Sequence, residues 1–221
     1  MEGINIHDQI LFTLPVFQVT DTLDAVITFF EETTFSHVAV TEDEVFLGLL
    51  SENDLGCFQP ETSIESFRYQ LETFSVSNET LWLDVLEEFA KNDANLLPVL
   101  DDVGRVTGYY DLNAIVALFI ATPFFTEPGG ILIISKGIKD YSMSEISQIV
   151  ESNNSRLLGA FITDNQNDLI QVTLKVNGTN LNEVIQSFRR YGYTILSGTN
   201  DDQFMQDLKE RSDYLDKYLN V

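Results

Sequence analysis

Two stretches of the chain, 60 positions apart, follow the same pattern. They are Gly48-Leu49-Leu50-Ser51-Glu52-Asn53-Asp54-Leu55 and Gly108-Tyr109-Tyr110-Asp111-Leu112-Asn113-Ala114-Ile115. The residues before them correspond as well: His37-Val38-Ala39-Val40 aligns with Leu97-Pro98-Val99-Leu100, and Thr22-Leu23 aligns with Thr80-Leu81. This period is too long for a solenoid repeat, so the pattern indicates a small module that has been duplicated.

Apolar periodicity and turn residues predict the same elements in each copy. In the first copy they predict an extended Leu14-Pro15-Val16, a helix after Asp21-Thr22, strands over Phe35–Val40 and Val45–Leu50, and a short helix over residues 51–55. In the second copy they predict a helix after Glu79-Thr80 that buries Leu81, strands over Leu96–Leu100 and Arg105–Tyr110, and a closing helix over Asn113–Phe119.

The second half of the chain predicts a different order of elements. Strands are expected over Ile131–Ser135, Arg156–Thr163, Leu169–Val176 and Tyr193–Leu196, with a turn over Asp164–Asp168 and helices that begin at Ser142 and Asn180. This β-α-β-β-α-β order is the split βαβ, ferredoxin-like plan. Residues 201–221 predict a charged helix that packs either on its own domain or against another subunit.

Charge is distributed unevenly along the chain. Residues 1–128 hold 23 acidic side chains and three basic ones, whereas residues 129–221 hold 12 and nine, out of a net charge of −23. This asymmetry supports a domain boundary near residue 128. Without a basic stripe, the sequence argues against a nucleic-acid partner.

The sequence also argues against a secreted or membrane protein. The N-terminus lacks the basic segment of a signal peptide, and the longest apolar run, Ala114–Ala121, is too short to span a bilayer. Cys57 is the single cysteine, so no internal disulfide can form. We therefore expect a soluble, cytoplasmic protein.

The residue patterns of known catalytic sites are absent. The two histidines, His7 and His37, have no metal-ligand spacing with Cys57, and no nucleophile elbow, Walker A or dinucleotide-binding motif occurs. His37 is expected to be packed or hydrogen-bonded at the start of a strand. We predict that the protein is not an enzyme and holds no metal through these residues.

Ser51 and Asp54 allow two interpretations. A hydroxyl at a helix start suits a phosphate or another anion, and a carboxylate suits vicinal sugar hydroxyls. Alternatively, Ser51 caps the short helix and Asp54 complements its dipole.

Residues 8–122 resemble a tandem CBS-domain pair, or Bateman module. The resemblance rests on Leu14-Pro15-Val16, on Leu97-Pro98-Val99-Leu100-Asp101-Asp102, and on the G-x-x-[ST]-x-x-D signature from Gly48 to Asp54. It implies β-α-β-β-α units, two sheets packed about a pseudo-twofold axis, and clefts for adenine nucleotides. The residues that the resemblance assigns to nucleotide binding are Val16, Phe17, Val38, Gly48, Ser51 and Asp54.

The second copy departs from this pattern, because Asp111 replaces the hydroxyl and Ala114 replaces the carboxylate. At most one nucleotide site is therefore expected. The first copy is acidic and poor in Lys and Arg, which phosphates prefer. Its cleft could hold AMP, ADP, ATP or S-adenosylmethionine, with Mg²⁺ as an aid to a phosphate, or stay empty.

Residues 130–197 look like an ACT-type domain, and the whole arrangement is similar to the AcuB-like bacterial proteins. The resemblance implies a small ligand, often an amino acid, at the first strand-to-helix loop, where Lys136, Gly137 and Lys139 lie. A plain turn with solvated lysines is the alternative. We expect CBS motifs over residues 1–62 and 63–127, an ACT-like domain over 128–199 and a helix over 200–221.

These observations lead to two competing functional hypotheses. The first is a homodimeric regulatory protein that senses a small ligand and changes its dimer or partner contacts. The second is a scaffold with vestigial clefts, whose acidic surface binds a basic protein.

Overall fold

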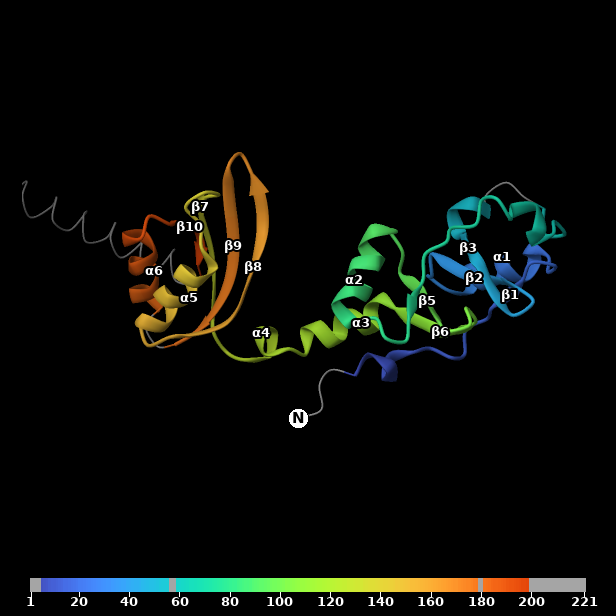
Figure 1. Ribbon diagram of the computed structural model, residues 1–221, viewed down its shortest axis with the longest axis horizontal. Helices are drawn as coiled ribbons and strands as arrows, with labels where there is room; N and C mark the ends of the chain where they lie inside the picture. Colours follow the sequence, from blue (N-terminus) through green and yellow to red (C-terminus); the bar gives the residue numbers. More distant parts are fainter. Residues whose placement is uncertain (1–4, 56–58, 179–180, 199–221) are drawn as a thin grey trace, which may run out of the picture. The chain divides into compact units, whose positions relative to one another are not determined.

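The computed structural model in Figure 1 describes residues 5–55, 59–178 and 181–198. The chain divides into two compact units, Met1–Ile120 and Ala121–Val221. Cys57, Asn180 and the helix expected over residues 200–221 lie outside the described residues.

The first unit contains both copies of the repeat. A short 3-10 helix, η1 (Ile6–Gln9), precedes the first copy. The elements of the first copy are β1 (Phe17–Gln18), α1 (Leu23–Glu32), β2 (His37–Glu42), β3 (Val45–Ser51) and the 3-10 helix η2 (Glu52–Leu55). Those of the second are η3 (Ile64–Phe67), β4 (Val76–Ser77), α2 (Trp82–Lys91), β5 (Leu96–Leu100), β6 (Val106–Asp111) and α3 (Leu112–Ile120).

Each copy forms a three-stranded sheet, in the order β1-β2-β3 and β4-β5-β6. In both, the first strand is parallel to the second and the last two form an antiparallel hairpin. The tight turn between β2 and β3 holds Asp43 and Glu44 at positive φ, as two-residue hairpin turns commonly require. The duplicated strand pattern is therefore confirmed.

The structure corrects the alignment of the middle strands by one residue. His37 pairs with Ser51 in the first hairpin, and Leu96, not Leu97, pairs with Asp111 in the second. The turn of the second hairpin is one residue longer than the turn of the first. Gly48 and Gly108, in the last strands, are therefore again 60 positions apart. Because side chains alternate along a strand, this shift decides which face each residue occupies.

The segment before each copy adds a strand-like pairing to the other copy. Leu49 exchanges two main-chain hydrogen bonds with Glu72, at 2.7 and 3.0 Å, and Tyr109 exchanges two with Leu11, at 2.8 and 3.0 Å. The two copies are thus joined reciprocally, each through the lead-in of its neighbour.

A second reciprocal contact lies between Ser36 and Asn95, which precede β2 and β5. The Ser36 N–H donates to Asn95 Oδ1 at 2.7 Å, and the Asn95 N–H donates to Ser36 Oγ at 3.0 Å. Asn95 Nδ2 also donates to the carbonyl of Thr34. Equivalent positions of the repeat therefore bind each other, as expected about a pseudo-twofold axis.

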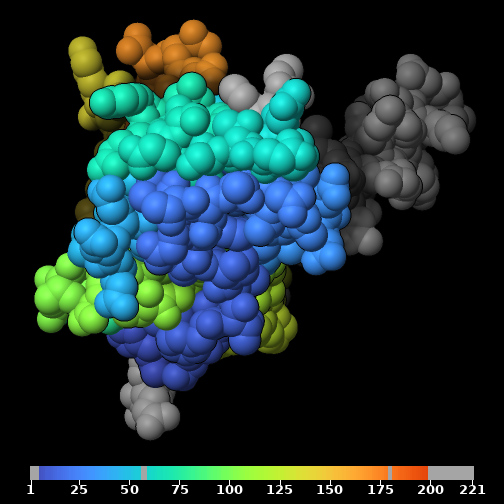
Figure 2. Space-filling view, turned by 90° about the vertical axis from the view of Figure 1, so that its right-hand side faces the viewer, coloured from blue at the N-terminus to red at the C-terminus, as the bar shows by residue number. Residues whose placement is uncertain are grey.

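The segment that connects the copies packs on the start of α1. The Leu23 N–H donates to the carbonyl of Thr62, and the Ile64 N–H donates to the carbonyl of Asp21. Figure 2 shows this segment, in turquoise, lying against the blue residues of the first copy. The connection is therefore part of the packed unit.

The second unit starts with a short helix, α4 (Pro123–Thr126). Its main elements are β7 (Gly130–Gly137), α5 (Met143–Ser152), β8 (Arg156–Gln166), β9 (Leu169–Asn177), α6 (Leu181–Arg190) and β10 (Thr194–Gly198). The antiparallel sheet has the order β10-β7-β9-β8, and α5 and α6 lie on one of its faces (Figure 1). The predicted β-α-β-β-α-β order is confirmed.

Two local predictions were wrong. β8 continues to Gln166, so the hairpin turn is the pair Asn167-Asp168, both at positive φ. Such a two-residue turn matches the twist of the flanking strands, and the strands extend to meet it. Leu81 lies before α2 and is 69% exposed, because the helix starts one residue later than its counterpart in the repeat.

No helix within residues 5–55, 59–178 and 181–198 is long and apolar enough to cross a membrane.

Candidate functional site

Ser51 is the last residue of β3 and is 5% exposed. Its Oγ accepts a hydrogen bond from the Asn53 N–H at 3.3 Å. In the second copy, Asp111 Oδ1 accepts from the Asn113 N–H at 3.0 Å in the same way. Both side chains thus support the turn that leaves the strand, and the Ser51 hydroxyl retains its own proton for a further acceptor.

Asp54 lies in η2 and is partly exposed. Within the part of the chain that the structure describes, its carboxylate makes no hydrogen bond or ion pair. The second copy has Ala114 at this place, in the regular helix α3.

Gly48 approaches a neighbouring main chain. A Cβ at this position would lie 2.7 Å from Leu71 Cβ and 2.9 Å from the Glu72 carbonyl oxygen. Its twin, Gly108, meets Ile10 and Leu11 in the same manner, at 2.5 and 2.8 Å. The glycine of the repeated signature therefore makes room for the lead-in of the other copy, a reason that the sequence did not reveal.

The predicted apolar walls occupy different environments. Val16 is 36% exposed, whereas Phe17 is buried and Val38 is fully buried. Val38 pairs with Leu50, on the opposite face of the sheet from Ser51, which pairs with His37. The structure therefore places Val38 on a different face of the sheet from Ser51.

Tyr109, from the second copy, contacts main-chain groups that are next in sequence to Val16 and Val38. Its hydroxyl donates to the Pro15 carbonyl at 2.7 Å and accepts from the Ala39 N–H at 3.1 Å. Its side chain is fully buried in the core of the first copy, and this burial raises the pKa of the hydroxyl well above its ordinary value. Sequence reasoning missed Tyr109, although a hydroxyl at a position that is leucine in the other copy was a usable signal.

His37 is packed and hydrogen-bonded, as predicted. Its Nδ1 lies 2.8 Å from Ser36 Oγ, its Nε2 lies 3.3 Å from Glu72 Oε1, and its ring meets Phe74 edge-on. Across the described ranges, no group of three His, Cys, Asp or Glu side chains could hold a metal ion.

Each lysine and arginine of the first unit has a carboxylate partner. Arg68 binds Glu42 at 2.8 Å, and it lowers the pKa of that carboxyl. Lys91 pairs with Glu87 and Glu88, and Arg105 pairs with Asp101 and more distantly with Glu44. An anionic ligand that used one of these three side chains would therefore compete with a carboxylate for it.

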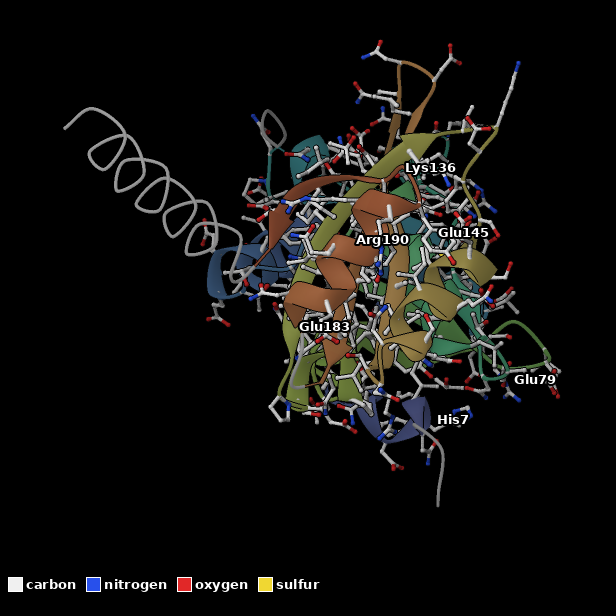
Figure 3. The ribbon with its side chains drawn as sticks, turned by 90° about the vertical axis from the view of Figure 1, so that its left-hand side faces the viewer. His7, Glu79, Lys136, Glu145, Glu183 and Arg190 are labelled. Carbon is white, nitrogen blue, oxygen red and sulfur yellow. The ribbon has the colours of Figure 1, made fainter. Side chains whose placement is uncertain are left out.

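In the second unit, Lys136 does not point freely into its loop. Its Nζ lies 2.8 Å from Glu145 Oε2 (Figure 3). It also lies 4.3 Å from the centre of the Tyr193 ring. The Tyr193 hydroxyl donates to the same carboxylate oxygen at 2.7 Å. The Lys136 side chain therefore helps to hold α5 on the sheet.

This cluster predicts a pH-dependent contribution to stability. Lys136 and the Tyr193 hydroxyl hold the pKa of Glu145 below its ordinary value of 4.5. A carboxyl of this kind stabilises the fold above its unfolded pKa, and the contribution is lost as pH falls through the folded pKa. We expect Glu145→Gln to lower the unfolding free energy by about 1 kcal/mol at pH 7 and by much less at pH 3.5.

Urea unfolding followed by circular dichroism measures this difference. Glu183→Gln is the matched control, since Glu183 is exposed on α6 and has no ion pair with a described residue. A loss that is equal at both pH values would contradict the assignment.

The predicted ligand loop forms a shallow cavity of about 300 Å³, lined by Gly137, Ile138, Lys139, Asp140 and Asp168. The Asp140 and Tyr141 N–H groups donate to the Gly137 carbonyl, so the loop is a regular turn. Of its two lysines, Lys139 is the one that lines this cavity.

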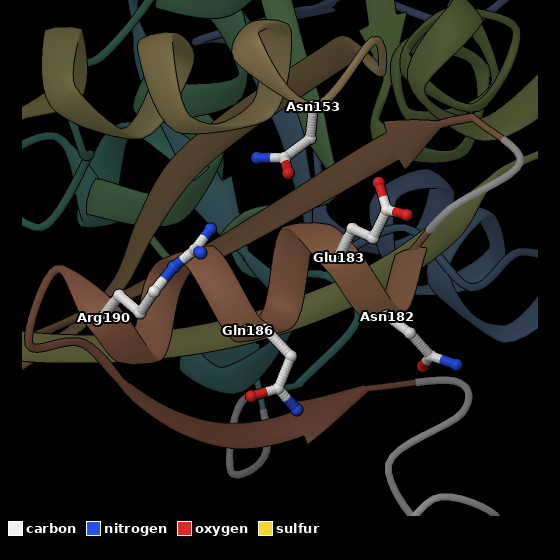
Figure 4. Close-up of a pocket in the computed structure, with 5 residues that line it drawn as sticks. All are labelled: Asn153, Asn182, Glu183, Gln186 and Arg190. Carbon is white, nitrogen blue, oxygen red and sulfur yellow. The ribbon is translucent and has the colours of Figure 1, made fainter.

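A second cavity, of about 340 Å³, is lined by Asn153, Asn182, Glu183, Gln186 and Arg190 (Figure 4). Arg190 donates to Ser187 Oγ, which donates to Asn153 Oδ1. This chain of hydrogen bonds ties α6 to the end of α5, so Arg190 has a structural role there.

Comparison with known proteins gives a likeness of fold. No family model matches the sequence, and no curated protein matches it. About half of the chain is similar to solved CBS-domain structures. One is the CBS domains of a transcriptional regulator from Streptococcus pneumoniae (16% identity, 52% of this chain and 99% of that chain, TM-score 0.47).

Two others are a CBS domain pair/ACT domain protein from Thermotoga maritima (18% identity, 53% and 97%, TM-score 0.47) and the cystathionine beta-synthase pair domain of a magnesium transporter from Shewanella oneidensis MR-1 (20% identity, 54% and 71%, TM-score 0.46).

Proposed function

We propose that the chain is a non-catalytic regulatory protein whose first repeat copy binds an adenosine-type ligand that carries no net negative charge. The observation that supports this class is the pairing of Arg68, Lys91 and Arg105 with carboxylates. Phosphates bind most strongly to cationic donors, and the three lysine and arginine side chains of the first unit are already paired. Adenosine and S-adenosylmethionine fit better than AMP, ADP or ATP, which need Mg²⁺ to offset their charge.

Ser51 and Asp54 are the polar residues assigned to this ligand. The carboxylate of Asp54 has no partner among the described residues and can accept both hydroxyls of a ribose. The hydroxyl of Ser51, held in place by the Asn53 N–H, can donate to an oxygen of the ligand. Val16, which is 36% exposed, is the apolar residue assigned to this ligand.

The two copies share main-chain and side-chain contacts, so a ligand that prefers one arrangement of the copies would shift the population of that arrangement. In this proposal the shift changes contacts in a homodimer or with a protein partner. We also propose that residues 128–199 are an ACT-like domain of AcuB-like type, in which Lys139 rather than Lys136 would meet a ligand carboxylate.

A thermal-shift experiment with the full chain tests the ligand class. At 100 times its dissociation constant, a ligand stabilises the fold by about 2.7 kcal/mol. We expect shifts with adenosine and S-adenosylmethionine, and a shift with ATP only when Mg²⁺ is present. Asp54→Ala should abolish them, whereas Asp102→Ala, in the exposed turn between β5 and β6, should leave them unchanged.

A larger shift with ATP alone than with adenosine would contradict the proposed class. A shift with an amino acid that survives Asp54→Ala and disappears in Lys139→Ala would move the site to the second unit.

The competing function is an interaction scaffold, and the acidity of the first unit favours it. Residues 1–128 carry 23 acidic and three basic side chains. A scaffold would show no ligand-dependent stability, and it would bind a basic protein with an affinity that falls as salt increases.

A further inference from the structure

Two main-chain groups of the first copy, the Pro15 carbonyl and the Ala39 N–H, point at the same atom. That atom is the Tyr109 hydroxyl oxygen, at 2.7 and 3.1 Å. Pro15 and Ala39 are the direct neighbours of Val16 and Val38, which the sequence assigned to the ligand cleft. The first copy therefore presents one acceptor and one donor side by side, and a side chain of the second copy satisfies both.

The second copy cannot form the same arrangement. Pro98 stands at the position equivalent to Ala39. Ala39 pairs with Leu49, the third residue from the end of β3, and Pro98 pairs with Tyr109, the third residue from the end of β6. Proline has no N–H, and Leu49 has no hydroxyl. The donor–acceptor pair is thus a feature of the first copy alone, the copy that also holds Ser51 and Asp54.

We propose that the Tyr109 hydroxyl occupies the position that a polar edge of the ligand would take. In this position it acts as a latch that holds the two copies together. This inference rests on the proposed function. Adenine carries an N6–H₂ donor next to a ring-nitrogen acceptor, the complement of a carbonyl and an N–H. An adenine that binds Pro15 and Ala39 must displace the Tyr109 hydroxyl, so ligand and latch exclude each other.

Displacement of the Tyr109 hydroxyl explains how ligand binding to the first copy would affect the second copy. Tyr109 lies in β6, whose main chain also pairs with Leu11. Its release would remove the side-chain contact between β6 and the main chain of the first copy. The ligand must bind the open state, so its apparent affinity is reduced by the small fraction of molecules that are open.

Tyr109→Phe tests the latch, with Tyr110→Phe as the matched control. The Tyr110 hydroxyl is buried and has no hydrogen-bond partner among the described residues, so its removal leaves no group unpaired. Adenosine binding to the full chain is measured by isothermal titration calorimetry, and the urea midpoint by Trp82 fluorescence.

We expect Tyr109→Phe to lower the urea midpoint and to bind adenosine on the order of tenfold more tightly, because the closed state loses its hydrogen bonds. Tyr110→Phe should match the natural chain in affinity. Tyr109→Leu, which introduces the residue of the equivalent position in β3, provides a second variant if Tyr109→Phe does not fold.

The outcomes distinguish a failure of the latch from a failure of the proposed function. Equal or weaker binding by both folded Tyr109 variants, with clear binding by the natural chain, would overturn the latch alone. No binding of adenosine by the natural chain or by any variant would overturn the proposed function and the latch together. Tighter binding by Tyr110→Phe as well would also overturn the latch, because the effect would then not depend on the Tyr109 hydroxyl.

Discussion

Replacing Gly48 with alanine is expected to lower the free energy of unfolding of the first unit by about 1–3 kcal/mol. The new methyl group would lie 2.7 Å from Leu71 Cβ and 2.9 Å from the carbonyl oxygen of Glu72. Because one of these atoms is main chain, the lead-in must move away from β3, and its two hydrogen bonds with Leu49 must lengthen.

Urea unfolding followed by the fluorescence of Trp82, the single tryptophan, measures this effect in the first unit. Gly108→Ala should behave alike, since its Cβ would lie 2.8 Å from the Leu11 carbonyl oxygen. Gly137→Ala, in the second unit, is a control for a glycine-to-alanine change without a close main-chain contact, because the nearest atom to its Cβ is Asp140 Oδ2 at 3.4 Å. An unchanged midpoint in both Gly48→Ala and Gly108→Ala would show that the lead-ins do not hold the copies together.

Asn95→Ala is expected to cost about 1–3 kcal/mol of stability. The side chain accepts from the Ser36 N–H and donates to the Thr34 carbonyl, both at 2.7 Å, so its removal leaves two main-chain groups of the first copy without their partners. The loss should be visible in the same Trp82 unfolding curve, although Trp82 lies in the second copy, because the copies unfold together.

Asn113→Ala controls for loss of an asparagine in the same unit. The Asn113 side chain is exposed, and its one contact with a described residue is a long one of 3.4 Å to Asp111, so the change should stay within about 0.5 kcal/mol. Two separate unfolding transitions in Asn95→Ala would contradict a single cooperative unit.

The repeat predicted most of the fold of the first unit because period-two apolar strands and polar turns are local signals. The one-residue error in aligning His37 with Leu97 shows the limit of that reasoning. The longer second turn changed the strand register, and register depends on hydrogen bonds between strands that residue patterns do not reveal. The reciprocal pairing of Leu49 with Glu72 is equally non-local.

The site was less predictable than the fold. The signature predicted Ser51 and Asp54 on one helical turn, whereas the structure places Ser51 at the end of β3 and Asp54 in η2. The roles of Gly48 and Lys136 depended on partners distant in sequence, Leu71 and Glu145. The sequence did not reveal the role of Tyr109 for the same reason, because its hydroxyl binds residues more than 60 positions away, in the other copy.

The most direct test of the account is the affinity of the full chain for S-adenosylmethionine and for ATP, measured by isothermal titration calorimetry without Mg²⁺. The account predicts saturable binding of S-adenosylmethionine that Asp54→Ala abolishes, and much weaker binding of ATP, because Arg68, Lys91 and Arg105 are already paired. Tighter binding of ATP than of S-adenosylmethionine, or binding that Asp54→Ala leaves unchanged, would contradict it.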